Sequence, residues 1–461
     1  MKYVMAIDFG STFTKIVIID REQKKVIHSD KTPSTVGHDA AIGMNKCFDI
    51  AKGIIGEEEF VKAQKLASSS AAGGLRMAVI GLTKSLSLMA GEAAALGAGA
   101  KVIGNYIGRL GEDDVRSLEE SNAEILLFGG GYEHGNQSMV LHNAEMIANS
   151  NIRFPIIYCG NSDISADVRR IMFSHKKECF LVENMLPHLG EKNVEPVQEV
   201  IRNLFLQRIT DMKGFDQVKK EFDNDFMPTP KAVLGAGELL SKGTDTESGL
   251  GQLVIIDVGG ATTDVYSMNQ NKSFMGAKMT GLPEAYEKRT VEGDLGMRES
   301  SAGVLTGKYL TAAAKKTGLS EERIKASISM RMEDHDFLPD TDDERHIDDA
   351  IASTAISRAV RRHAGYVQKA YERGSRLFQY GKNLTEITSV IGTGGILVFN
   401  EKAATLLAEV QKRQGEDEIL LPEVVKPYLD TEYVLFAAGL LREFDEETAL
   451  LIMKNSLKPC K

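Results

Sequence analysis

The chain has 461 residues, of which 43% are hydrophobic and 26% charged, and its formal net charge at pH 7 is −10. This length predicts more than one domain with buried cores. The acidic balance argues against a general binder of nucleic acid or anionic membrane, because both attract clustered positive charge. The sequence shows no signal peptide and no long uncharged apolar stretch, so we expect a cytoplasmic protein that does not span a membrane.

The chain is predicted to begin with three strands, at 3–7, 14–20 and 25–28. The first strand runs into a turn with an acid, a glycine, two hydroxyls and a lysine: Asp8, Gly10, Ser11, Thr12 and Lys15. Glycine lets backbone N–H groups approach an anion, and hydroxyls add donors to phosphate oxygens. A carboxylate at a strand end can hold Mg²⁺ through its water shell. The turn is therefore predicted to bind a phosphate.

Strands and helices then alternate over about 78–183. Strands are expected at 77–80, 101–107, 124–128, 155–159 and 179–182. Helices are expected at 84–98, 112–121, 138–149 and 163–173. This alternation predicts a parallel sheet with helices on its faces.

Two helices are predicted next, at 195–212 and at 229–240, the second begun by Thr229 and Pro230. A second apolar strand then leads into a turn of similar composition: Asp257, Gly259, Gly260, Thr262, Thr263 and Asp264. A third strand at 390–398 is broken by a glycine cluster, Gly392, Gly394 and Gly395. Two acid–glycine–hydroxyl turns in one chain suggest two related lobes that hold one polyphosphate.

A helical, acidic stretch lies between the second and third motifs, at 320–372. Its carboxylates are Glu333, Asp334, Asp336, Asp340, Asp342, Asp343, Glu344, Asp348 and Asp349. We interpret it as a solvated face or flexible loop, with a docking surface for a basic partner as the alternative.

The three motifs, in this order, resemble the phosphate-one, phosphate-two and adenosine elements of the superfamily of actin, sugar kinases and heat-shock chaperone ATPases. The resemblance implies an α/β fold of two ribonuclease H-like lobes. We expect a first lobe at 1–250 with the insertion at about 78–183, a second lobe at 251–430, and a C-terminal connecting helix and tail at 431–461.

The same resemblance implies ATP and Mg²⁺ as cofactors and gives each motif residue a role. Asp8 and Asp257 would hold the metal's water shell. Gly10, Ser11, Thr12 and Lys15 would hold the β-phosphate. The opposite face would be held by Gly259, Gly260, Thr262 and Thr263, with Asp264 organising the site. Gly392, Gly394 and Gly395 would lie against the adenosine. Glu238, on the predicted connecting helix, is the candidate for activating water, and an exposed helix-surface carboxylate is the alternative.

Four further segments resemble the GlmL/MutL family of accessory ATPases of glutamate (methylaspartate) mutase, which is unrelated to the mismatch-repair protein called MutL. They lie at 69–77, 141–144, 157–161 and 289–298. The resemblance covers essentially the full length. It implies a chaperone-like reactivase that uses ATP to release damaged cobalamin from an adenosylcobalamin-dependent mutase, either glutamate mutase or a related aminomutase. No nucleic-acid or membrane partner is expected, and the oligomeric state stays open, a homo-oligomer included.

Three alternatives share the fold. A small-molecule kinase would need a catalytic Asp between the phosphate motifs, and none is compelling. An actin-like filament or scaffold protein would share the motifs, but the insertion is atypical for one. An activator of 2-hydroxyacyl-CoA dehydratases would need cluster cysteines. The four cysteines, which we expect to be unpaired thiols, do not have that spacing: Cys47, Cys159, Cys179 and Cys460.

Overall fold

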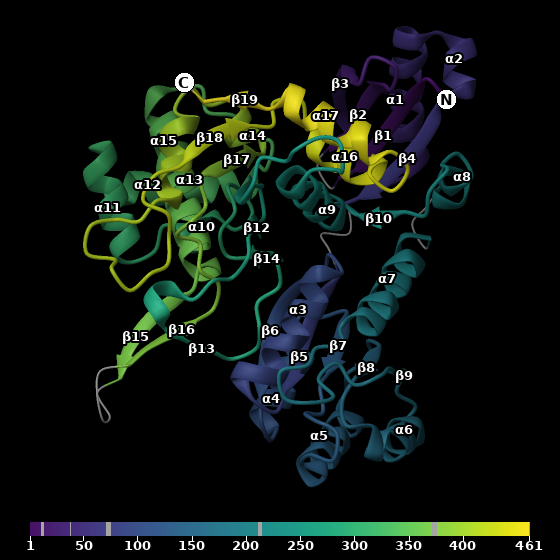
Figure 1. The fold of residues 1–461 in the computed structure, drawn as a ribbon, viewed down its shortest axis with the longest axis vertical. Helices are drawn as coiled ribbons and strands as arrows, with labels where there is room; N and C mark the ends of the chain where they lie inside the picture. Colours follow the sequence, from purple (N-terminus) through teal and green to yellow (C-terminus); the bar gives the residue numbers. More distant parts are fainter. Residues whose placement is uncertain (11–12, 37, 71–74, 211–213, 371–375, 461) are drawn as a thin grey trace. The chain divides into compact units, whose positions relative to one another are not determined.

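The computed structural model describes residues 1–10, 13–36, 38–70, 75–210, 214–370 and 376–460 (Figure 1). The chain forms two compact units. The first comprises Met1–Gln23, Ile27–Ala232 and Gly281–Pro283, and the second comprises Lys24–Val26, Val233–Thr280 and Glu284–Lys461. Among the described helices, none combines the length and apolar character needed to cross a bilayer.

The first sheet of the first unit has the strand order β10-β4-β1-β2-β3. Its strands are β1 (Tyr3–Phe9), β2 (Phe13–Asp20), β3 (Lys25–Pro33), β4 (Gln64–Ser69) and β10 (Met227–Pro228). β1 pairs with β2 in antiparallel fashion and with β4 in parallel. Helices α1 (Ala40–Ile55) and α2 (Glu57–Lys62) connect β3 to β4. α1 begins where the Asp39 side chain accepts a hydrogen bond from the Ala41 N–H, which caps a free backbone donor.

A second sheet of the first unit lies in the chain between β4 and β10. Its order is β6-β5-β7-β8-β9, and all its neighbours are parallel. The strands are β5 (Arg76–Gly81), β6 (Lys101–Ile107), β7 (Ile125–Phe128), β8 (Ile156–Tyr158) and β9 (Cys179–Leu181). The helices are η1 (Lys84–Leu88), α3 (Met89–Gly97), α4 (Glu112–Glu120), α5 (Gln137–Ala148), η2 (Ser162–Ile164) and α6 (Ser165–Ser174). The predicted α/β insertion is confirmed.

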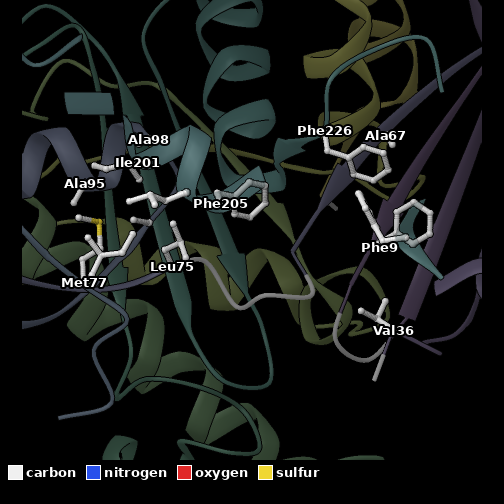
Figure 2. Packing of buried hydrophobic residues seen from close by; sticks show 14 of the residues in the cluster. Phe9, Val36, Ala67, Leu75, Met77, Ala95, Ala98, Ile201, Phe205 and Phe226 are labelled. Atoms are coloured by element: carbon white, nitrogen blue, oxygen red, sulfur yellow. The ribbon is translucent and has the colours of Figure 1, made fainter. Parts of the chain in front are cut away.

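One hydrophobic cluster joins the two sheets of the first unit (Figure 2). It contains Met5, Ile7 and Phe9 of β1 together with Met77 and Val79 of β5. Phe9 faces Phe226, with ring centroids 5.7 Å apart. Helices α7 (Glu195–Thr210) and α8 (Phe215–Lys219) also contribute to this cluster. The opposite face of the inserted sheet has its own core, so the central strands β5, β7 and β8 are apolar on both faces, as parallel strands covered by helices must be.

The main sheet of the second unit has the order β14-β12-β11-β17-β18-β19. Its strands are β11 (Leu253–Val258), β12 (Thr263–Met268), β14 (Glu287–Glu292), β17 (Ser389–Thr393), β18 (Lys426–Leu429) and β19 (Lys458–Pro459). A smaller sheet, β13-β16-β15, is formed by Lys278–Thr280, Arg376–Tyr380 and Tyr366–Ala370. The short 3-10 helix η3 (Phe274–Gly276) precedes β13.

The longer helices of the second unit are α11 (Lys308–Thr317), α12 (Glu321–Glu333), α13 (Asp342–His363), α16 (Val434–Leu441) and α17 (Glu446–Ser456). The short ones are α10 (Ser301–Val304), α14 (Gly395–Val398), α15 (Ala403–Leu407) and η4 (Ala408–Val410). Helix α9 (Thr229–Lys242) begins in the first unit and continues, from Val233, in the second.

Both main sheets repeat one strand order. The orders β3-β2-β1-β4-β10 and β14-β12-β11-β17-β18 correspond position by position: the central strand, β1 or β11, is antiparallel to the strand that follows it in the chain and parallel to β4 or β17, which has a further parallel strand beside it. This is the ribonuclease H-like order, occurring twice. The protein therefore has the predicted α/β fold, a two-lobed actin-like architecture with an α/β insertion in the first lobe.

The acidic stretch differs from its interpretation as a solvated face. Glu344 and Asp348 are 4% and 2% exposed, and both accept hydrogen bonds from the fully buried Arg331. Asp349 pairs with Lys402. The exposed carboxylates of the stretch are Glu333, Asp334, Asp336, Asp340, Asp342 and Asp343. The solvated-face interpretation was therefore wrong for Glu344 and Asp348, because helix periodicity turns these two toward a buried arginine.

Candidate functional site

The first candidate turn follows β1 and is centred on Asp8. This carboxylate is 1% exposed, and its register partners are Lys15 on β2 and Ser68 on β4. The hydroxyls of Ser68 and Thr229 donate to Asp8 Oδ1 at 3.3 and 2.5 Å, and that of Ser70 donates to Oδ2 at 3.4 Å. Lys15 Nζ lies 3.9 Å from Oδ2. The buried acid at this turn is thus surrounded by hydroxyl donors from β4, from the residue after β4 and from the first residue of α9.

Burial is the main influence on the acidity of Asp8 and raises the pKa of its carboxyl above the ordinary value. Lys15 and the three hydroxyls lower the pKa and offset only part of this effect. The negative charge is therefore incompletely compensated by the protein. A cation beside Asp8 would remove the remaining cost of ionisation, so the donor set suits a metal held through water.

Gly10 is required by the close approach of the chain to itself. Its N–H donates to the Phe13 carbonyl at 3.0 Å, and a Cβ at position 10 would lie 2.5 Å from that same oxygen. The Gly10 carbonyl accepts from the Ser34 hydroxyl at 2.6 Å. Any larger residue would open the turn. Ser11 and Thr12, predicted as phosphate ligands, lie outside the described residues.

The second candidate turn follows β11. Asp257 is partly exposed and is in register with Asp264 on β12 and Thr393 on β17. The turn closes through the Gly259 N–H, which donates to the Thr262 carbonyl at 2.9 Å. In both turns a glycine N–H donates to the carbonyl of the residue three positions later, and both follow a strand that has a parallel neighbour, β4 for β1 and β17 for β11.

Asp264 is the counterion of a buried arginine. Arg289 on β14 donates to Asp264 Oδ1 through Nε at 2.9 Å and Nη2 at 2.6 Å, and both residues are less than a tenth exposed. The other carboxylate oxygen accepts from the Thr262 hydroxyl at 3.0 Å. Thr263 is fully buried, and its hydroxyl donates to the Leu295 carbonyl at 2.5 Å. Asp264 therefore orients the Thr262 hydroxyl, and the hydrogen bond from Thr263 ties the turn to the Leu295 carbonyl.

Residues 295–298, which we call the strap, donate hydrogen bonds to the backbone of the second turn. The Met297 N–H donates to the Gly259 carbonyl at 3.0 Å, and the Arg298 N–H donates to the Gly260 carbonyl at 2.8 Å. A Cβ on Gly296 would lie 2.4 Å from the Gly260 oxygen. This strap ends the segment 289–298, which resembles the GlmL/MutL family in sequence but whose place beside the second turn the sequence did not reveal.

The glycine cluster after β17 packs directly onto β11. Gly394 has φ of +94°, and a Cβ there would lie 2.3 Å from the Val258 carbonyl oxygen. Gly392 fits against Leu407, whereas a Cβ on Gly395 would meet no atom within 4 Å. Gly395 therefore borders open space, where a flat group could approach the backbone.

Two residues near the glycine cluster, Asp430 and Tyr433, were not singled out from the sequence. Asp430 is 1% exposed; its N–H donates to the Gly392 carbonyl at 2.9 Å, and its carboxylate accepts from the Val434 N–H at 2.7 Å. Burial, with the negative charges of Asp257 and Asp430, raises the pKa of Tyr433 to about 12. The sequence does contain a signal for Asp430, because an acid shortly before the start of an apolar helix commonly accepts hydrogen bonds from the first N–H groups of that helix.

Glu238 on α9 is already engaged in ion pairs. Lys242 Nζ lies 2.7 Å from its Oε1, and Arg442 Nη1 lies 3.2 Å from its Oε2. Burial raises the pKa of the carboxyl, but the hydrogen bonds from these two cations outweigh burial and lower it. The group is held ionised, with both oxygens in use, and its assignment as the water-activating residue stays a prediction.

Across the part of the chain that the structure describes, no three or more His, Cys, Asp or Glu side chains gather as a metal-binding group. A metal ion held at either turn would therefore need further oxygen ligands from water or from a phosphate. Mg²⁺ commonly binds in this way.

Comparison with known proteins identifies the family. The chain matches the family described as MutL protein over residues 4–457. It is 37% identical over 461 residues to Protein MutL from Clostridium tetanomorphum, with 99% of each chain covered. The chain belongs to the MutL family.

Two kinases are among the solved structures similar to this MutL-family chain. Xylulose kinase from Bifidobacterium adolescentis has 12% identity and a TM-score of 0.31, with 100% of this chain and 94% of that chain covered. Glucokinase from Balamuthia mandrillaris has 9% identity and a TM-score of 0.28, with 98% and 94% covered. Scores this low support no conclusion, so the fold assignment rests on the repeated strand order.

Proposed function

We propose that this MutL-family protein is a Mg²⁺-dependent ATPase that reactivates an adenosylcobalamin-dependent mutase by releasing damaged cobalamin. Glutamate mutase or a related aminomutase would be the client. The observation that carries the proposal is the repeated sheet: in both units the first strand ends in an acid followed by a glycine turn, in a chain matched by the family over nearly its full length. Two such turns suit a nucleotide with several phosphates.

The residues would divide the nucleotide among them as follows. Asp8 and Asp257 would hold Mg²⁺ through water, and the metal would supply neutralisation of phosphate charge. Phosphate oxygens would be held by Gly10, Ser11, Thr12 and Lys15 from the first turn, and by Gly259, Gly260, Thr262 and Thr263 from the second. Adenosine would lie against Gly392, Gly394 and Gly395. Phosphoryl transfer mainly requires such positioning and charge neutralisation.

Three features of the described residues support this division. Asp8 is buried with an incompletely compensated charge, as a metal-associated acid would be. Thr262 is oriented by Asp264, so its hydroxyl is held in one place. Gly395 leaves space beside its backbone. Each is a property of one unit considered alone.

Coupling to a mutase requires that the ATP-bound and ADP-bound states differ in their affinity for it. A nucleotide that binds both conformations equally would shift no equilibrium. The proposal therefore predicts that mutase capture depends on which nucleotide is bound.

The test uses a cobalamin mutase inactivated by a tightly bound inert cobalamin. Steady-state ATP hydrolysis and cobalamin release are measured together, with the intact protein and with Asp8→Ala. ATP-dependent release that restores mutase activity, and that Asp8→Ala abolishes, would support the proposal. Asp30→Ala, at an exposed acid of the same sheet, is the control and should behave like the parent. ATP turnover without release from glutamate mutase or an aminomutase would refute the reactivase function and favour a small-molecule kinase.

A further inference from the structure

Arg298 connects the second turn to a distant loop. Its N–H donates to the Gly260 carbonyl at 2.8 Å, while its guanidinium donates to the Phe337 carbonyl through Nε at 3.2 Å and Nη2 at 3.0 Å. Phe337 lies in the loop 334–341 between α12 and α13. One residue therefore hydrogen-bonds both the backbone of the candidate phosphate turn and the backbone of this loop.

The Arg298 side chain is fixed by a buried ion network. Two of its nitrogens donate to the two oxygens of Asp348 on α13, each at 3.1 Å. Asp348 also accepts from Arg331 Nε at 2.8 Å, and Arg331 Nη1 donates to Glu344 at 2.6 Å. The four side chains are between 0% and 13% exposed and carry two positive and two negative charges, and the more exposed Arg323 also pairs with Glu344. Such a network holds its members in one arrangement.

The far end of this connection is an exposed loop. Asp334, Asp336 and Asp340 are exposed, and Leu338 is 79% exposed. The loop is attached to the body of the unit at Phe337, whose ring lies under both Arg298 and Arg331, with centroid distances of 5.9 and 4.7 Å. A small displacement of the Arg298 backbone would therefore be passed to Phe337.

We propose that Arg298 is a positioning residue for nucleotide binding and that it makes the loop 334–341 respond to nucleotide. A phosphate held by the N–H groups of the second turn would fix the Gly260 peptide, the strap 295–298 would follow, and the guanidinium would hold the Phe337 carbonyl more firmly. The inference rests on the proposed nucleotide-binding function and adds a regulated surface to it.

Lysine cannot replace this arginine. The planar guanidinium spans both oxygens of Asp348 and the Phe337 carbonyl at once, whereas an ammonium is a single point charge on a flexible stem. Arg298→Lys keeps the charge balance of the buried network, so the fold should survive while the connection to Phe337 is broken. Arg345→Lys is the matched control, because Arg345 donates to the Asp340 carbonyl of the same loop without contacting the turn.

The experiment measures Mg·ADP binding by calorimetry and, in parallel, hydrogen exchange of peptides covering 334–341 with and without Mg·ADP. In the parent protein, nucleotide should slow exchange in this loop at least about threefold. Arg298→Lys should weaken Mg·ADP binding by about tenfold or more and abolish the nucleotide-dependent change, while Arg345→Lys should retain both. Gly296→Ala, whose added Cβ would collide with the Gly260 carbonyl oxygen and so displace the turn and the strap together, should also lose both.

The outcomes separate this inference from the proposed function. If the parent protein binds no Mg·ADP, the nucleotide-binding function fails and the inference fails with it. If the parent binds but its loop does not respond, or Arg298→Lys responds like the parent, the inference is overturned and the proposed function stands. Unchanged exchange in β17 peptides confirms that a variant is folded, and if Arg298→Lys is not, the loop response of the parent protein to Mg·ADP decides.

Discussion

The turns after β1 and β11 occupy the same place in two sheets of the same strand order, yet they balance charge differently. Seven residues after each acid, and directly opposite it on the next strand, stands Lys15 in the first unit and Asp264 in the second. Lys15 faces Asp8 itself, and its side chain is 30% exposed. Asp264 adds a second acid, which buried Arg289 neutralises from the third strand. One topology thus accommodates opposite charges at one position, provided a neighbouring strand supplies the counterion.

The largest expected effect comes from removing either acid. Asp8→Ala and Asp257→Ala should each lower kcat/KM for Mg-dependent ATP hydrolysis by about a thousandfold, which is about 4 kcal/mol of transition-state stabilisation. Steady-state kinetics of both variants test whether the two turns are equally necessary. Asp30→Ala and Asp417→Ala are exposed-acid controls, one for each unit, and should keep full activity. Activity that survives loss of one acid would make that turn dispensable.

Removing the counterion of each turn should destabilise the two units to different extents. Arg289→Met leaves Asp264 buried and unpaired, and should destabilise the second unit by about 3 kcal/mol. Lys15→Met removes a cation that is 30% exposed and 3.9 Å from Asp8, and it leaves the three hydroxyl donors of Asp8 in place, so it should cost less, about 1 kcal/mol. Urea titrations followed by hydrogen exchange of peptides from β12 and β2 would show each change in its own unit. Equal losses would mean that the solvent exposure of the two counterions does not decide their effect.

Alanine substitutions of the adjacent Gly394 and Gly395 test the predicted adenosine element. Gly394→Ala should destabilise the second unit by about 2 kcal/mol, because its φ of +94° and the nearby Val258 carbonyl both oppose a side chain. Gly395→Ala has no such neighbour, so its stability should be nearly unchanged. Thermal unfolding and ATP KM are measured for both. If Gly395→Ala also leaves KM unchanged, its backbone does not border the nucleotide.

The smallest expected effect is an increase in the stability of the first unit. Because burial raises the pKa of Asp8, the folded protein binds this proton more tightly than the unfolded chain does, so stability falls as pH rises from the ordinary value of 3.8 through the folded pKa. Asp8→Asn removes that cost and should stabilise the first unit by about 1 kcal/mol at pH 7, with less dependence on pH. Urea midpoints at pH 5 and pH 8 test this. A variant less stable than the parent at pH 8 would mean that ionised Asp8 is fully compensated.

The sequence predicted the features that are formed by residues close together in the chain. A buried strand followed by an acid, a glycine and hydroxyls revealed both turns, and strand–helix alternation revealed the inserted sheet. It was uninformative about partners far apart in the chain. Nothing near Asp264 indicates Arg289, 25 residues later, and nothing near Arg298 indicates Asp348, 50 residues later. Glu344 and Asp348 were misread because an acidic run predicts exposure unless the cation they face is known.

The first unit also has a consequence for synthesis. Thr229 is 221 residues from the Asp8 carboxylate to which it donates, and β10, which pairs with β4, immediately precedes it. At a ribosomal rate of about 5–20 residues per second, about 10–45 seconds pass between these two residues. The acid is therefore made long before its last hydroxyl partner, and the whole inserted sheet is translated in between. The hydroxyl environment of Asp8 is thus completed only after this interval, when β10 and the start of α9 have been made.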